Sequence, residues 1–273
     1  MTEESRTGGA VVIGVDCAVH HRNVGLARVV MGGATRPLVE EVVAGDAPSW
    51  DAIDARILRW VTGPTLIALD APLGWPAPLG EGLVSHRAGA SLSDSAHAMF
   101  RRQTDDVVAD RVGKRPLDVG ADRIARTAHA ALDLLARLRA KMGRAMPLAW
   151  SPGPVDEGVH IIEVYPAATL AARGLPSRGY KGSKPSSVAV RREIMRGLGD
   201  DIHAAPATVA VAVARDHGLD AVVCALAALD FMTASVIRPR DPVRAAREGW
   251  IWVRDPSRTG EDEKGVVLPR PRG

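Results

Sequence analysis

The fold is decided by the stretch Val11-Val12-Ile13-Gly14-Val15-Asp16-Cys17-Ala18, a run of β-branched and small residues that carries one carboxylate near its end. A run of this length and composition predicts a buried β-strand over 10–17. Apolar residues on both faces indicate a sheet that is covered on both sides. Asp16 then lies at the carboxyl end of a buried strand, where ligand and catalytic groups gather in open α/β sheets.

A second stretch repeats this pattern at Leu66-Ile67-Ala68-Leu69-Asp70-Ala71-Pro72. An apolar strand again delivers one acid at its end. Pro72 biases the preceding residue away from helix and ends the element. The two stretches together predict that Asp16 and Asp70 reach the same edge of one sheet.

Composition limits the class of protein. A chain of 273 residues with 46% apolar residues predicts one α/β domain with a sizeable insertion. The net charge of +3 permits an anionic partner without requiring one. Cys17 and Cys224 lie in apolar runs and are typical of buried thiols in a reducing compartment. No apolar run reaches membrane-spanning length without a polar break, and residues 1–9 lack the apolar core of a signal peptide, which predicts a cytoplasmic protein with no membrane partner.

The first half of the chain predicts a mixed sheet. After the first strand, 24–30 and 37–43 are predicted as antiparallel hairpin partners. Ser49 is predicted to cap a helix, and 65–70 forms the fourth strand. A helical crossover makes that strand parallel to the first.

The rest of the chain is predicted to contain a largely helical insertion over 72–158 and then to return to the sheet. A fifth strand is expected over 160–166, in a sheet flanked by helices.

The Gly, Ser and Lys-rich stretch 174–187 is predicted to be mobile, and the Arg/Pro/Gly-rich tail 254–273 is predicted to be disordered. Helices are expected at 91–100, 121–142, 190–198, 205–215 and 219–237, with an edge strand or covering segment at 249–253.

Four acids are placed by apolar elements rather than by polar surface: Asp16, Asp70, Glu163 and Asp220. Several buried carboxylates close together repel one another, which raises their pKa values, so a positive group must compensate. A pair of Mg²⁺ or Mn²⁺ ions suits such oxygen ligands. Two ions about 4 Å apart support phosphodiester hydrolysis. The pattern therefore predicts metal-dependent phosphoryl chemistry.

Each acid also has a structural interpretation. Asp16 and Asp70 could accept backbone hydrogen bonds in turns. Glu163 could pair with an arginine from the insertion. Asp220 could stabilise the dipole of a helix that Asp216 caps.

The remaining polar candidates are His217 and a set of basic residues. His217 lies three residues before Asp220 on one helix face and could be a metal ligand, a proton carrier or a polar helix-start residue. Asp105 follows an arginine pair and is a candidate member of the site. Phosphate contacts or a solvated basic face are the two interpretations of Arg101, Arg102, Lys181, Lys184, Arg191 and Arg192.

Several motifs together resemble the DUF429 family of predicted nucleases, which is placed in the ribonuclease H-like fold. The resemblance runs from about residue 10 to 253. The motifs are Ile13-Gly14-Val15-Asp16, Leu69-Asp70-Ala71-Pro72-Leu73-Gly74, Arg102-Gln103-Thr104-Asp105, Glu163-Val164-Tyr165-Pro166 and His217-Gly218-Leu219-Asp220-Ala221.

This resemblance implies a metal-dependent nuclease with Asp16, Asp70 and Asp220 as ligands of two Mg²⁺ or Mn²⁺ ions and a nucleic acid as substrate. Glu163 is a family-type acid of less clear role. Arg102 and Asp105 match a family motif that has no assigned chemistry. The motif that ends in Asp220 is also similar to the last-helix motif of RuvC-type Holliday-junction resolvases, in which a His or Asp and a following Asp complete the metal site.

The leading hypothesis is a ribonuclease H-like nuclease in which Asp16 bridges two metals, Asp70 and Asp220 each hold one, and His217 or Glu163 assists. One alternative is an ATP-dependent phosphotransferase related to actin-like kinases, which would need a Gly-rich phosphate loop that Cys17-Ala18-Val19-His20 does not provide. Another is a non-catalytic module that has kept the fold. No P-loop and no G-x-G-x-x-G motif occurs.

Overall fold

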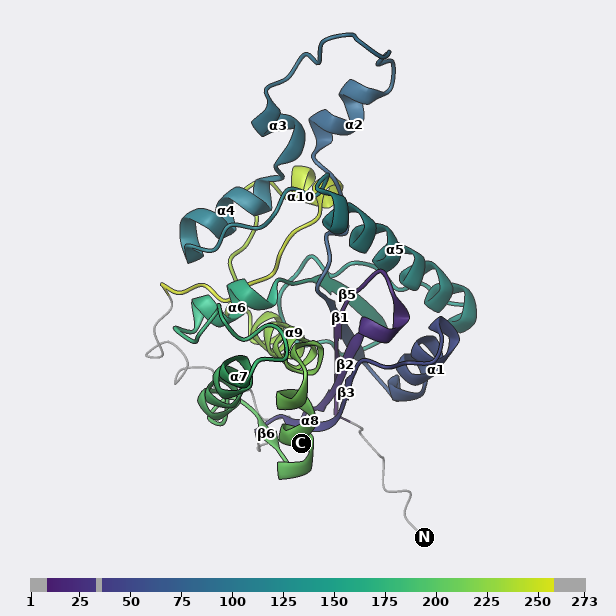
Figure 1. The fold of residues 1–273 in the computed structure, drawn as a ribbon. Helices are drawn as coiled ribbons and strands as arrows, with labels where there is room; N and C mark the ends of the chain where they lie inside the picture. Colours follow the sequence, from purple (N-terminus) through teal and green to yellow (C-terminus); the bar gives the residue numbers. More distant parts are fainter. Residues whose placement is uncertain (1–8, 33–35, 258–273) are drawn as a thin grey trace, which may run out of the picture.

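The computed structural model describes residues 9–32 and 36–257, which form a mixed β-sheet between two layers of helices (Figure 1). The strand order is β5-β4-β1-β2-β3-β6. The strands are β1 (Val11–Asp16), β2 (Gly25–Val30), β3 (Leu38–Ala44), β4 (Thr65–Leu69), β5 (Val159–Glu163) and β6 (His203–Ala204).

The strand directions confirm the predicted sheet. β1, β2 and β3 are antiparallel neighbours, whereas β4 is parallel to β1 and β5 is parallel to β4. Three antiparallel strands followed by two parallel ones give the ribonuclease H-like arrangement. The predicted count of five strands is short by one, because β6 is a two-residue strand beside β3 and leaves no periodic signal in the sequence.

Two layers of helices cover the sheet. Along β1, Val11, Ile13 and Val15 pack with α1 (Trp50–Trp60) and α5 (Asp122–Met142), and Val12 packs on the opposite side with α9 (Asp216–Met232). Figure 1 shows α1 and α5 on one side of the sheet and α9 on the other. The predicted Ser49 cap is confirmed, since its hydroxyl accepts a hydrogen bond from the N–H of Ala52.

Two glycines bring α9 directly onto the sheet. A Cβ at Gly14 would lie 2.0 Å from the carbonyl oxygen of Ala221, and one at Gly25 would lie 2.0 Å from that of His217. Only glycine allows the two backbones to approach so closely. These contacts fix the first turns of α9 over the carboxyl end of β1.

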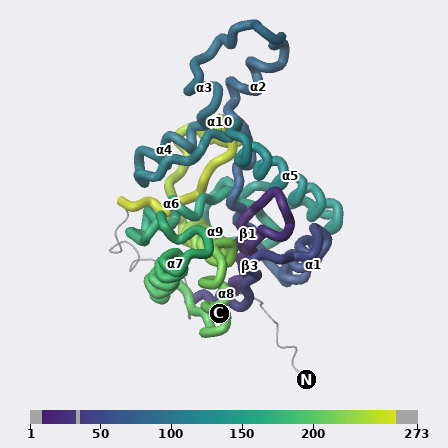
Figure 2. Tube along the Cα trace, viewed as in Figure 1, coloured from purple at the N-terminus to yellow at the C-terminus, as the bar shows by residue number. Residues whose placement is uncertain are grey.

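The segment between β4 and β5 contains α2 (Ala77–Leu83), α3 (Ala96–Phe100), α4 (Gln103–Val112) and α5. α5 has the predicted bounds, and Gly143 ends it with φ of 63°. The helix predicted over 91–100 begins only at residue 96, because Ser95 caps it. Figure 2 shows that α2, α3 and the loop joining them project away from the sheet.

The C-terminal half holds four helices that begin with proline: α6 (Pro166–Ala172), α7 (Pro185–Gly197), α8 (Pro206–Ala214) and α10 (Pro242–Glu248). The ring presets the backbone of the first helical turn. The helix expected at 205–215 is therefore confirmed. α6 is missing from the sequence-based prediction because Pro166 was interpreted only as the end of a strand.

The segment 249–257 covers the edge of the sheet as predicted for 249–253, and the N–H of Trp252 donates to the carbonyl of Glu163 at 2.9 Å. Arg254 forms a bridge with Val236, so the predicted disordered tail does not begin at residue 254. The rest of that tail, 258–273, and most of the polar lead-in, 1–8, lie outside the described residues. No helix in the described ranges is long and apolar enough to cross a membrane.

Candidate functional site

The parallel strands β1 and β4 bring two carboxylates to one edge of the sheet. Asp16 is the last residue of β1, and Asp70 follows β4 directly. The N–H of Asp70 continues the ladder by donating to the carbonyl of Val15 at 2.9 Å. The Asp16 side chain is buried and the Asp70 side chain half-buried.

The first turns of α9 add a histidine and a third carboxylate. Nδ1 of His217 lies 2.7 Å from Oδ2 of Asp16. Asp220, one turn further along, is fully buried. The spacing of three residues places both side chains toward Asp16, as the sequence predicts.

The loop before α7 supplies the positive charge. Lys181 forms an ion pair with Asp220 through Oδ2, and the hydroxyl of Tyr180 donates to Oδ1 of Asp220 at 2.9 Å. Tyr180 is buried, so it anchors the loop in the protein. The lysine side chain itself remains 57% exposed.

The prediction that 174–187 is mobile is therefore wrong for its central part, which is tied to the protein by several contacts. Arg191 is fully buried and donates to the carbonyl oxygens of Tyr180 and Gly182 at 2.5 Å and 2.8 Å. The N–H of Gly182 donates to Oδ2 of Asp216 at 2.9 Å. The phosphate contact considered for Arg191 does not hold, since this guanidinium shapes the loop from inside.

The electrostatics of the cluster show an excess of negative charge. Burial raises the pKa of Asp16, and burial together with the Asp16 carboxylate raises the pKa of Asp70 well above its ordinary value. Burial raises the pKa of Asp220 to about 6, although Lys181 opposes the shift. Burial alone would lower the pKa of Lys181, but Asp220, Asp16 and Asp70 raise it. The ammonium group is thus held in its charged form by all three carboxylates.

The donor chemistry fits a divalent cation. Three carboxylates provide hard oxygen ligands, and no residue in the described part of the chain donates a hydrogen bond to the Asp70 carboxylate. The side chains do not close around an ion as they stand: within 9–32 and 36–257 there is no group of three or more His, Cys, Asp or Glu that could hold a metal. Lys181 occupies the position beside Asp220 where a cation would compensate the charge.

A second buried cluster contains Glu163, Arg102 and Asp105. Nη1 of Arg102 donates to Oε2 of Glu163 at 3.0 Å, and Nη2 pairs with Oδ1 of Asp105 at 2.9 Å. All three side chains are nearly or fully buried. The structural interpretation of Glu163, pairing with an arginine of the insertion, is confirmed. This pairing gives all three residues a structural role inside the protein.

The other basic candidates lie apart from the carboxylates. Arg101 is directed toward Asp118 and the carbonyl of Pro116. Lys184 and Arg192 are exposed at the start and on the surface of α7.

Sequence reasoning missed Tyr180 and Tyr165, which contribute to this site. Burial and the Asp70 carboxylate raise the pKa of Tyr165, so its hydroxyl remains a neutral donor beside the cluster. One sequence feature could have pointed to them: the chain has only two tyrosines, one just after the strand that ends at Glu163 and one in a polar loop.

The family is decided by a match over most of the chain. The family described as "Protein of unknown function (DUF429)" matches residues 4–244. The chain belongs to the DUF429 family. This confirms the resemblance carried by the motifs from Ile13 to Ala221.

Other comparisons add little to the family assignment. No curated protein matches this DUF429 chain. Among solved structures, RuvC of Thermus thermophilus in complex with a Holliday junction substrate is similar, with 16% identity and a TM-score of 0.35. A second Thermus thermophilus RuvC structure has 15% identity and a TM-score of 0.35. Each comparison covers 82% of this chain and 95% of the RuvC chain.

Proposed function

We propose that this protein is a metal-dependent nuclease that hydrolyses phosphodiester bonds. The observation that carries the proposal is the meeting of Asp16, Asp70 and Asp220, from β1, the end of β4 and α9, around the Lys181 ammonium group. Three carboxylates from separate elements form one largely buried cluster that Lys181 faces, and such clusters of perturbed acids are typical of functional sites.

In this proposal Asp16, Asp70 and Asp220 would hold Mg²⁺ or Mn²⁺, and bound ions would activate water and stabilise the leaving oxygen. His217 fixes the orientation of the Asp16 carboxylate through its 2.7 Å hydrogen bond. Tyr180 does the same for Asp220. Lys181 is the group suited to a substrate phosphate, because over half of its side chain is exposed. A nucleic acid is the proposed substrate.

The test is cleavage of labelled DNA and RNA by purified protein with Mn²⁺ or Mg²⁺. The proposal expects cleavage by the wild-type protein and none by Asp16→Asn, since the amide keeps the shape and removes the charge. Asp46→Asn is the control, because Asp46 is an exposed carboxylate paired with Arg215 outside the cluster. Activity that survives in Asp16→Asn would show that the carboxylate cluster is not the source of cleavage.

A second candidate function is a non-catalytic nucleic-acid-binding module. The observation that favours it is the ion pair of Lys181 with Asp220, which already neutralises one of the three carboxylates. A module of this kind would bind oligonucleotides equally well with and without divalent ions and would release no product. Metal-dependent cleavage separates the two candidates.

A further inference from the structure

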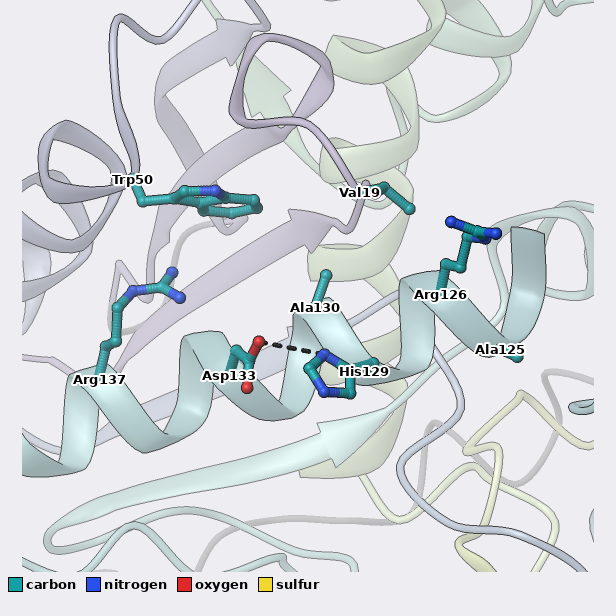
Figure 3. A pocket seen from close by; sticks show the side chains of 8 residues that line it. All are labelled: Val19, Trp50, Ala125, Arg126, His129, Ala130, Asp133 and Arg137. Atoms are coloured by element: carbon teal, nitrogen blue, oxygen red, sulfur yellow. Dashed lines mark ion pairs between the residues drawn. The ribbon is translucent and has the colours of Figure 1, made fainter. Parts of the chain in front are cut away.

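A pocket of about 470 Å³ lies on the α1 and α5 side of the sheet, outside the carboxylate cluster (Figure 3). Trp50 from the start of α1 and Val19 from the loop after β1 form one wall. The opposite wall is a face of α5 that includes Arg126, Ala130 and Arg137. The volume falls within the range of small-ligand sites. We call it the Trp50 pocket.

The indole of Trp50 forms a flat wall of the pocket, and the Arg137 guanidinium covers part of it. The guanidinium of Arg137 lies 4.8 Å from the centre of the Trp50 ring, and the methyl group of Ala130 points toward the indole (Figure 3). Arg137 is fixed by two hydrogen bonds to the fully buried Asp54, at 2.9 Å and 3.2 Å. The rings of His21 and Trp50 meet at 75°, with their centres 6.2 Å apart. The aromatic wall is therefore held in place before any ligand binds.

Two arginines, Arg126 and Arg137, and one acid, Asp133, line the pocket. Arg137 is paired with the buried Asp54. Arg126 is exposed, and its ion pair with the equally exposed Asp122 is of the kind that contributes little. His129 and Asp133 also line the pocket and pair with each other at 3.1 Å. Arg126 is thus available to a phosphate beside the pocket.

The pocket adjoins the carboxylate cluster along the chain. Val19 lies three residues after Asp16, and three residues span at most about 11 Å. The wall of the pocket is therefore close enough to Asp16 for one single strand to reach both.

We propose that the Trp50 pocket binds one unstacked base of a single-stranded nucleic acid. The base stacks on Trp50 beside the Arg137 guanidinium, and Arg126 contacts a neighbouring phosphate. Base stacking on an aromatic side chain tolerates any sequence and requires the base to leave the duplex. This inference rests on the proposed function and specifies its substrate class as single-stranded DNA or RNA, or a duplex with an unpaired stretch.

The test is fluorescence anisotropy of a labelled single-stranded oligonucleotide in EDTA, where no cleavage interferes. Trp50→Ala is expected to weaken binding by about 5- to 100-fold. Trp50→Phe keeps an aromatic ring and retains most of the affinity, whereas Trp50→Leu, which fills space without a ring, behaves like Trp50→Ala. Wild-type protein binds the single strand more tightly than the matched duplex.

Arg126→Gln tests the rim, with Arg247→Gln as the matched control because Arg247 is also exposed and paired with one exposed acid, Glu81. Arg126→Gln is expected to weaken binding and reduce its salt dependence, while Arg247→Gln does neither. Thermal unfolding checks that each variant is folded.

Three results of the binding experiments would overturn the inference. The first is a folded Trp50→Ala that binds the single strand as wild type does. The second is an affinity of Trp50→Leu for the single strand that equals that of Trp50→Phe, which would indicate an apolar protein or peptide partner instead. The third is Trp50-dependent binding of a free mononucleotide but not of the oligonucleotide. Cleavage that depends on Asp16 but not on Trp50 would refute only the role proposed for the Trp50 pocket. Trp50-dependent binding without any cleavage would refute only the proposed nuclease activity.

Discussion

At the scale of single residues, the site is a balance between three carboxylates and one lysine. Asp16, Asp70 and Asp220 each have a raised pKa, chiefly because of burial, and Lys181 is the cation that faces them. Such a group of acids is costly unless a cation is present. The lysine gives the protein a way to fold without metal, and it would have to move aside when a divalent ion binds.

The His217 and Asp16 pair predicts a pH-dependent stability. The hydrogen bond to Asp16 raises the pKa of His217 above its ordinary 6.5. The pair therefore contributes its stability below pH 6.5 wherever Asp16 is ionised, and loses it as the pH rises through the raised pKa of His217. Wild-type protein should exceed His217→Gln in free energy of unfolding by about 1–2 kcal/mol at the acidic side, and the difference should shrink at higher pH. Urea unfolding in EDTA, repeated at acidic and at higher pH, measures the free energies of unfolding of both proteins.

His86→Gln is the control for this prediction, because His86 is exposed and bonds only locally to the carbonyl of Ala90. A difference between wild type and His217→Gln that stays constant across pH would contradict a charged His217 beside Asp16.

Sequence reasoning located most residues of the site but not their environment. Asp16 and Asp70 were predictable because a strand end fixes where a side chain emerges, and His217 and Asp220 because helical spacing fixes a shared face. An arginine partner for Glu163 was foreseeable, but not which arginine, since Arg102 lies 61 residues away in the sequence. The same limit applies to Lys181, whose charge was evident but whose partner Asp220 is set by the path of a loop.

At the scale of elements, the site depends on how closely α9 lies on β1 and β2. Gly14 and Gly25 permit backbone contact, and this contact carries His217 and Asp220 to the edge where Asp16 ends its strand. The sheet order and the long helices were predictable from apolar periodicity. The helices that begin at Pro166 and Pro242 were not, because proline ends one element and begins the next with the same residue.

Gly14→Ala tests this contact between elements. The new Cβ would lie 2.0 Å from the carbonyl oxygen of Ala221 and 2.7 Å from the N of Ala225, so α9 must shift. We expect a loss of about 1–3 kcal/mol or more in the free energy of unfolding, since overpacking forces backbone movement. Gly63→Ala is the matched control, because its Cβ would meet nothing within 4 Å. Equal stability of the two variants, measured by denaturant unfolding, would contradict the close approach of α9.

At the scale of the whole molecule, the loop that leaves β1 connects the carboxylate cluster with the Trp50 pocket. The carboxylates lie where β1 and β4 end, and the Trp50 pocket lies beside the loop that leaves β1. The segment between β4 and β5 supplies α5 as one wall of that pocket, and it supplies Arg102, which pairs with Glu163 of β5 inside the protein. The sequence predicted the insertion as a helical block, but its role in building a pocket depends on a tertiary contact between α1 and α5 that periodicity does not report.

The central claim is that Asp16, Asp70 and Asp220 share a divalent cation. The most direct measurement is a crystal structure of the protein grown with Mn²⁺, with anomalous diffraction used to locate the metal. The account predicts an anomalous peak bonded to oxygens of all three carboxylates, with the Lys181 ammonium displaced from Asp220. A peak elsewhere, or no peak while Lys181 stays paired with Asp220, would contradict it.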